Sequence, residues 1–183
     1  MDWARQIRTL SIVVELRPTP FDHPDSQRLI AELQEVYRER YGGEDETAVD
    51  PREFAPPGGF FVVGYAEGVP VACGGWRERR AGEAAPLRDG DAEVKRMYVN
   101  AAHRGRGYAR AVLAQLERSA VAAGLRRIVL ETGTMQPEAI ALYTSAGYVP
   151  MPAFGAYAES PTSRYFAKAL RTGRLPAPAS GSR

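Results

Sequence analysis

Two glycines, Gly105 and Gly107, lie between a predicted strand and a predicted helix, at a turn whose backbone can bind an anion. Consecutive backbone N–H groups and the positive end of a helix converge there, and larger side chains would block the ligand. Residues 104–109 therefore predict a phosphate-binding loop, although a tight turn without a ligand has the same signature. The loop lacks the Gly-Lys-Ser/Thr ending of a nucleotide P-loop and the spacing of a dinucleotide fingerprint, which disfavours ATP and NAD.

The elements around this loop follow from hydrophobic periodicity. Residues 91–100 predict a strand, and regular alternation would place on one of its faces Glu93, Lys95, Met97 and Val99. A helix follows to about Ala123, with a buried stripe formed by Val112, Leu113, Leu116 and Ala120. Residues 127–132 predict a buried strand, so the two strands of this unit should be neighbours or near neighbours.

The remaining segments predict a mixed sheet with helices. Residues 11–17 are typical of a strand. Ser26 is typical of a helix N-cap, and the helix that it begins should end at residues 41–43. A short helical turn at 50–54 should precede a hairpin of residues 60–66 and 69–76, in which Gly74-Gly75 marks a bulge or a close backbone approach. A second helix at 137–145 and late strands at 148–149 and 163–170 complete the order.

Length and composition favour one globular domain over residues 1–171, with a disordered tail at 172–183. The chain has 183 residues, of which 44% are hydrophobic and 25% charged. One cysteine excludes an internal disulfide, and with two histidines a metal site is not expected. No apolar run is long enough for a membrane span or a signal peptide, so we expect a cytoplasmic protein.

Charge is distributed unevenly along the chain. Up to Gly90 there are 11 arginines and 16 acidic residues, whereas the remainder holds 13 basic and 6 acidic residues. A basic C-terminal half suggests a polyanionic ligand, and acidic residues 44–46 would suit a cationic amine. A scatter of solvated surface charges explains the same counts, and that alternative stays open.

Two motifs in this chain resemble those of the GNAT superfamily of N-acetyltransferases. Arg104-x-x-Gly107-x-Ala109 matches its acetyl-CoA signature, Arg/Gln-x-x-Gly-x-Gly/Ala. Residues 136–148 (QPEAIALYTSAGY) resemble its second motif, Asn-x-x-Ala-x-x-Leu-Tyr-x-x-x-Gly-Phe/Tyr, with Gln136 in the Asn position. The likeness covers residues 13–170 and is closest to stand-alone bacterial small-molecule members. It implies an α/β (α+β) fold with a mostly antiparallel sheet of six to seven strands, about four helices, and strands splayed at the acetyl-CoA site.

The resemblance also implies where acetyl-CoA binds. Backbone groups of Met97, Tyr98 and Val99 would hold the pantetheine arm and the acetyl carbonyl. Gln136 would contact the cofactor with an amide one methylene longer than the usual one. The pyrophosphate would lie on the loop amides of Arg104, Gly105, Arg106, Gly107, Tyr108 and Ala109, with Arg110 adding charge.

Catalysis requires two proton transfers. An alkylammonium of pKa near 10.4 is neutral in only about one part in 2,500 at pH 7, a cost of about 4.6 kcal/mol. A general base would therefore help, and Glu93 resembles the catalytic glutamate of some family members in its spacing to the loop. A strand glutamate paired with a basic residue is the alternative. Tyr143 occupies the family's general-acid position and would protonate the departing thiolate, although it could equally be a packing residue.

The function that we predict is acetyl transfer from acetyl-CoA to the primary amine of a small molecule, by direct attack in a ternary complex. A protein or peptide acetyltransferase, and a non-catalytic module that binds acyl-CoA, stay open as alternatives. Nucleic acid binding through basic residues is disfavoured because no strand interleaves aromatic and basic residues. We expect no membrane or metal partner, and a homodimer is possible for the fold.

Overall fold

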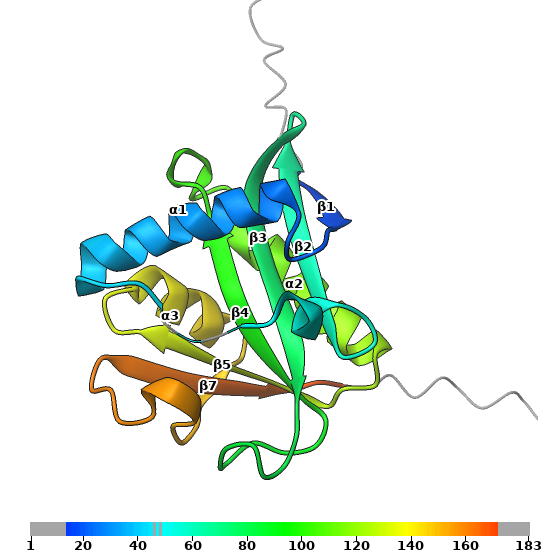
Figure 1. Cartoon of the computed structure of the whole chain (residues 1–183), viewed down its shortest axis with the longest axis vertical. Coiled ribbons are helices and arrows are strands. Elements are labelled where there is room, and N and C mark those ends of the chain that lie inside the picture. Colours follow the sequence, from blue (N-terminus) through cyan, green and yellow to red (C-terminus); the bar gives the residue numbers. More distant parts are fainter. Residues whose placement is uncertain (1–13, 46, 48, 172–183) are drawn as a thin grey trace, which may run out of the picture.

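A computed structural model of the chain describes residues 14–45, 47 and 49–171, and its centre is an open sheet (Figure 1). The strands are β1 (Glu15–Pro18), β2 (Gly59–Ala66), β3 (Val69–Arg79), β4 (Asp91–Val99), β5 (Arg127–Gly133), β6 (Val149–Pro150) and β7 (Ser163–Ala169). They lie in the order β1-β2-β3-β4-β5-β7-β6. Every neighbouring pair is antiparallel except β4 and β5, which run parallel. The predicted mixed, mostly antiparallel sheet is confirmed.

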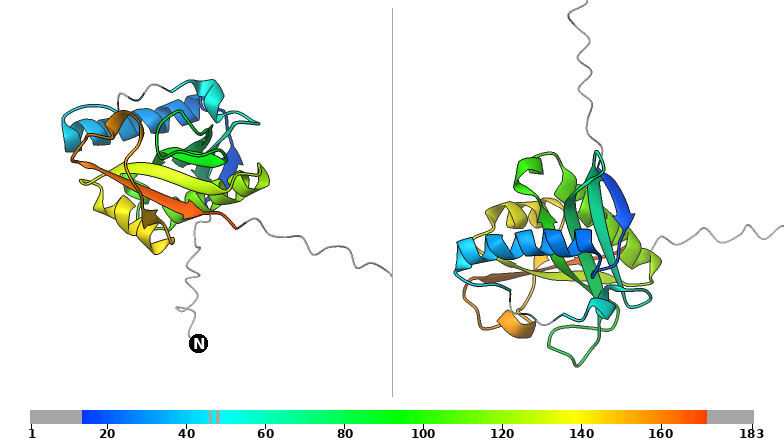
Figure 2. Two further views of the ribbon diagram at one scale, coloured as in Figure 1. Left: turned by 90° about the horizontal axis from the view of Figure 1, so that it is seen from below. Right: turned by 45° about the horizontal axis from the view of Figure 1, so that its top comes forward.

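In the described part of the chain three α-helices cover the sheet, where the sequence predicted about four. They are α1 (Pro24–Tyr41), α2 (Tyr108–Ala122) and α3 (Pro137–Ser145). Helix α1 lies on one face and α2 and α3 on the other (Figure 2). Between α1 and β2 the described residues form only a 3-10 turn, Pro51–Phe54, which confirms the short helical turn predicted there.

The start of α1 differs from the sequence prediction. The N-cap is His23, whose side chain accepts a hydrogen bond from the backbone N–H of Asp25. Ser26 lies inside the first turn, fully buried, and donates to the carbonyl of Pro20 at 2.8 Å. Pro24 at the first helical position explains the shift, because a proline there needs no hydrogen-bond acceptor.

Each face of the sheet has its own core. Helices α2 and α3 bury one face with the predicted stripe Val112, Leu113, Leu116 and Ala120. The α1 face has an aromatic cluster that includes Phe21, Phe54 and Phe61. Gly75 lies in this second core, where an added Cβ would come within 2.4 Å of the Phe61 ring. The predicted close backbone approach at Gly74-Gly75 is confirmed.

Strands β4 and β5 separate along their length, and this separation forms the site. They pair from Asp91 opposite Arg127 to Val94 opposite Leu130, and no pairing between them extends further. The predicted splay is therefore confirmed. The predicted strand residues 11–13 and the predicted tail at 172–183 lie outside the described part of the chain.

Candidate active site

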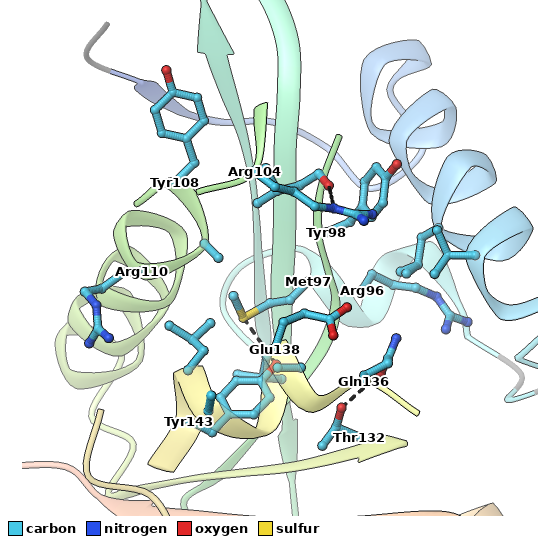
Figure 3. A pocket seen from close by; sticks show the side chains of 18 of the residues that line it. Arg96, Met97, Tyr98, Arg104, Tyr108, Arg110, Thr132, Gln136, Glu138 and Tyr143 are labelled. Carbon is cyan, nitrogen blue, oxygen red and sulfur yellow. Dashed lines mark hydrogen bonds between the residues drawn. The ribbon is translucent and has the colours of Figure 1, made fainter. Parts of the chain in front are cut away.

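A cavity of about 590 Å³ opens where β4 and β5 diverge, beside the N-terminus of α2 (Figure 3). It contains ten of the predicted site residues: Met97, Tyr98, Val99, Arg104, Gly105, Gly107, Tyr108, Ala109, Gln136 and Tyr143. Two predicted site residues, Glu93 and Arg106, do not line it. The strand, the loop that follows it and the more distant second motif thus meet around one space.

The loop before α2 has the geometry of an anion site. Gly105 and Gly107 have φ of 76° and 81°, and Gly107 caps the helix without a side-chain hydrogen bond. The space next to both α-carbons is open, so glycine is needed here for its left-handed backbone conformation. The uncapped N–H groups and the helix dipole favour a phosphate group at this end of α2. These features fit the pyrophosphate of acetyl-CoA.

Three exposed arginines surround the loop. Arg104 donates from Nε to the Val99 carbonyl at 3.1 Å, and its guanidinium lies 5.9 Å from the centre of the Tyr98 ring. Arg110 lines the cavity and donates to Ser145 at 2.7 Å. Arg106 bonds the carbonyl of Ala102 at 3.4 Å, outside the cavity. Arg104 and Arg110 are therefore better placed than Arg106 to face an anion in this space.

Tyr143 places a buried phenol at the inner end of the cavity. It is 6% exposed, and its hydroxyl donates to the Sδ of Met97 at 3.6 Å (Figure 3). Burial raises the pKa of this phenol, and the negative charge of Glu131 raises it further. A thioether is a weak acceptor, so a stronger acceptor in the cavity would readily take over this hydrogen bond.

The predicted face of Glu93 is wrong, because β4 contains a bulge. Cys73 pairs with Tyr98 and Gly75 with Lys95, so β4 has one extra residue between these pairs. Arg96, with φ of 58°, accommodates it. Beyond the bulge the alternation reverses, and Met97 packs on the α2 face while Glu93 lies on the α1 face.

Glu93 is 5% exposed and lies among basic side chains. Its Oε2 accepts from Arg77 at 2.9 Å and from Arg79 at 3.2 Å, and Oε1 is 3.5 Å from the Lys95 ammonium. This is the paired strand glutamate that the sequence left open as the alternative. A catalytic role for Glu93 stays a prediction without support from its position.

We expect Glu93→Gln to destabilise the fold more than it slows catalysis. Removing one partner of a buried ion pair leaves uncompensated charge and costs about 3 kcal/mol in unfolding free energy. Urea denaturation measures this loss, and Glu78→Gln in the neighbouring strand is the control because no ion pair is formed by Glu78 among the described residues. Unchanged stability together with a large fall in kcat would instead support Glu93 as the base.

Glu131 is the carboxylate that the sequence analysis missed. It follows Leu130, the last residue of β5 opposite β4, and so lies where the strands begin to separate. It lines the cavity, and no described Lys, Arg or His lies within 4.0 Å of its carboxylate. Burial raises its pKa above the ordinary glutamate value. A carboxylate directly after the apolar run of residues 128–130 was the available signal.

Asp45 joins three segments beside the same space. Its carboxylate binds the Arg96 guanidinium and accepts from the Tyr157 hydroxyl at 3.0 Å and from the Thr47 N–H at 2.9 Å. Its backbone N–H donates to Gln34 on α1 at 3.0 Å. Burial opposes its ionisation, but the charges of Arg96 and Lys95 lower its pKa to about 2. The β4 bulge thus anchors the segment after α1.

Asp45→Asn should therefore lower the unfolding free energy at pH 7 by about 2 kcal/mol. The folded-state pKa is depressed, so this stabilisation is present above the unfolded pKa near 4. It disappears as the pH falls toward about 2. Thermal unfolding at several pH values tests this, with the exposed Asp22→Asn as control. A constant difference between wild type and Asp45→Asn down to pH 2 would contradict the assignment.

Gln136 connects the end of β5 to the start of α3. Its Oε1 accepts from the Thr132 hydroxyl at 3.0 Å and from the Gly133 N–H at 3.5 Å (Figure 3). The side chain lines the cavity, but its oxygen is directed at the protein itself. The extra methylene compared with asparagine therefore allows a contact within the chain, and the predicted contact with the cofactor remains untested.

Among the described residues there is no group of three or more His, Cys, Asp or Glu that could hold a metal ion. Within the same part of the chain, no helix combines the length and apolarity needed to cross a membrane.

Comparison with known proteins gives a consistent result. The family described as "Acetyltransferase (GNAT) family" matches residues 26–148. An IAA acetyltransferase of Azospirillum brasilense is 35% identical over 143 residues, covering 78% of this chain and 89% of that protein.

Solved structures agree in fold. An acyl-CoA N-acyltransferase of Klebsiella pneumoniae is 28% identical with a TM-score of 0.70, covering 87% of this chain and 99% of that one. A phosphinothricin acetyltransferase of Sinorhizobium meliloti, solved with acetyl-CoA, has a TM-score of 0.60 at 20% identity, covering 92% and 94% of the two chains.

Proposed function

Because this chain belongs to the GNAT family of acetyltransferases, we propose that it transfers the acetyl group of acetyl-CoA to the primary amine of a small molecule. The observation that carries this proposal is the convergence of Tyr143 and Glu131 in one cavity, next to an anion-binding loop. They approach from opposite faces of the sheet, and the separation of β4 and β5 allows them to meet. Tyr143 can supply a proton to the leaving group, and Glu131 can remove a proton from the attacking amine.

Acetyl-CoA supplies a thioester, whose carbonyl carbon the amine attacks directly, so that a C–N bond forms as the C–S bond breaks. The backbone amides of residues 104–109 and the first turn of α2 would hold its pyrophosphate. Arg104 and Arg110 add positive charge on the two sides of this loop. The unpaired edge of β4 beyond Val94 leaves backbone groups available to the pantetheine arm.

Tyr143 would donate its phenolic proton to the leaving sulfur. The hydroxyl already donates to a sulfur atom, that of Met97, so the chain holds it in an orientation suited to such an acceptor. Burial excludes competing water, since the residue is 6% exposed. A neutral phenol is thereby kept ready at the point where negative charge develops.

We assign the proton acceptor to Glu131 rather than Glu93. Its carboxylate has no basic partner among the described residues within ion-pairing distance, whereas Glu93 has three. A raised pKa makes Glu131 a stronger base than an exposed glutamate while it remains ionised at neutral pH. It would take a proton from the substrate ammonium, directly or through one water, before the nitrogen attacks.

Thiol release in the presence of acetyl-CoA and single amines tests the proposal. We expect amine-dependent release of one thiol per acetylated amine, identified by mass spectrometry of the product. Transfer to peptide lysines or N-termini with no turnover of free amines would favour the protein acetyltransferase alternative. Acetyl-CoA binding without transfer to either class would favour the non-catalytic module.

A further inference from the structure

A second cavity, which we call the acceptor cavity, continues from the cofactor cavity toward α1. Its volume is about 140 Å³, and both cavities share Tyr37, Asp45, Glu131, Thr132 and Gln136. Pockets for drug-sized ligands are usually about 300–1,000 Å³, so this one suits a short aliphatic chain. An amine whose nitrogen lies at Glu131 would extend its other end into this space.

Resting on the proposed function, we propose that the acceptor is a short aliphatic diamine, whose second ammonium occupies the acceptor cavity. Three carboxylates line this cavity, those of Glu44, Asp45 and Glu131. Tyr37, Tyr41 and Tyr157 line it as well, and no Lys, Arg or His of the described chain does. Carboxylates combined with aromatic rings are the groups that bind an alkylammonium.

The charge balance at the cavity supports a cation and opposes an anion. Glu131 has no basic partner within ion-pairing distance in the described residues, and Lys95, whose charge acts on Glu131 from further away, lines only the cofactor cavity. Glu44 and Asp45 pair with Arg38 and Arg96, but neither arginine lines the acceptor cavity. A carboxylate on the acceptor would meet like charge there and would find no basic side chain in the lining.

The two ends of a diamine would have different partners. The reacting nitrogen lies with Glu131 and Tyr143 in the cofactor cavity. The second nitrogen reaches Glu44, which lines only the acceptor cavity and whose side chain is 49% exposed. Glu44 can release Arg38 and bind the second ammonium, because Arg38 keeps its ion pair with Glu35.

Four amines with the same four-carbon chain test this inference: diaminobutane, aminobutanol, butylamine and γ-aminobutyrate. We expect kcat/KM for diaminobutane to exceed that for butylamine and aminobutanol by about tenfold, and that for γ-aminobutyrate by about a hundredfold. The diamine preference should weaken at high ionic strength. Equal values for diaminobutane and aminobutanol, or a preference for γ-aminobutyrate, would overturn it.

Glu44→Gln and Glu35→Gln form a matched pair, because both carboxylates bind Arg38 and only Glu44 lines the acceptor cavity. Glu44→Gln should lower kcat/KM for diaminobutane about fivefold and leave butylamine unchanged, while Glu35→Gln changes neither. An equal effect of both variants would overturn the inference. Calorimetric titration of acetyl-CoA distinguishes failure of the proposed function from failure of the diamine proposal. Absence of acetyl-CoA binding would refute the proposed function. Binding of acetyl-CoA without turnover of the diamine would refute the acceptor class alone.

Discussion

Tyr143→Phe is expected to lower kcat by about 10²- to 10³-fold, because the leaving thiolate loses its proton donor. The ring and its packing against Tyr148 and Phe166 remain, so acetyl-CoA affinity and thermal stability should change little. Steady-state thiol release measures kcat, and calorimetry measures the affinity. The phenylalanine variant lacks only the hydroxyl oxygen, which in the wild type donates to the thioether of Met97.

Tyr148→Phe is the matched control for this variant. Tyr148 is also buried and its ring packs against that of Tyr143 at a tilt of 59°, but its hydroxyl donates to Glu117 at 3.0 Å and it does not line the cavity. We expect its kcat to stay close to that of the wild type. If Tyr143→Phe retained full kcat, or if both variants lost it equally, the acid role of Tyr143 would be refuted.

Glu131→Gln is expected to lower kcat/KM for an alkylamine by about 10²-fold at pH 7, since the glutamine cannot accept the ammonium proton. The loss should shrink as the pH approaches the pKa of the free amine near 10.4, where neutral amine is abundant without a base. A full pH profile of wild type and variant measures this convergence. A defect that is independent of pH would indicate a binding role.

We expect the raised pKa of Glu131 to set the acidic limb of the same profile. Wild-type kcat/KM should fall as the pH drops toward the pKa of this carboxyl, which lies above the usual glutamate value. The variant should lack this limb. Glu93→Gln serves as the comparison. The Glu93 carboxylate of the wild type is paired with Arg77 and Arg79, so we expect this variant to lose stability and to keep the acidic limb of the profile.

The sequence identified most of the residues on the loop side of the cavity because the signals there are local. Glycine with positive φ, an uncapped helix start and a short strand each act within a few residues of 104–109. Ten of the predicted residues therefore line one cavity. The order of elements alone also predicted that β4 and β5 are neighbours or near neighbours, and the structure pairs them in parallel.

The face of Glu93 was predicted wrongly because strict alternation does not reveal a bulge. One extra residue at Arg96 moves Met97 and Glu93 to opposite faces, and the backbone conformation that permits it is unusual for arginine. Its stabilising partner, Asp45, lies 51 residues away in the sequence. Long-range ion pairs of this kind determine the geometry of the cavity near Asp45, and a single sequence carries no local signal for them.

The most direct test of the central claim is a calorimetric titration of acetyl-CoA into the wild type, Gly107→Glu and Gly82→Glu. Both glycines have positive φ with open space around them, so the two variants carry similar backbone strain, and only Gly107 lines the cavity. We predict saturable binding to the wild type and Gly82→Glu, and none to Gly107→Glu. Equal binding by all three proteins, or no binding by the wild type, would contradict this account.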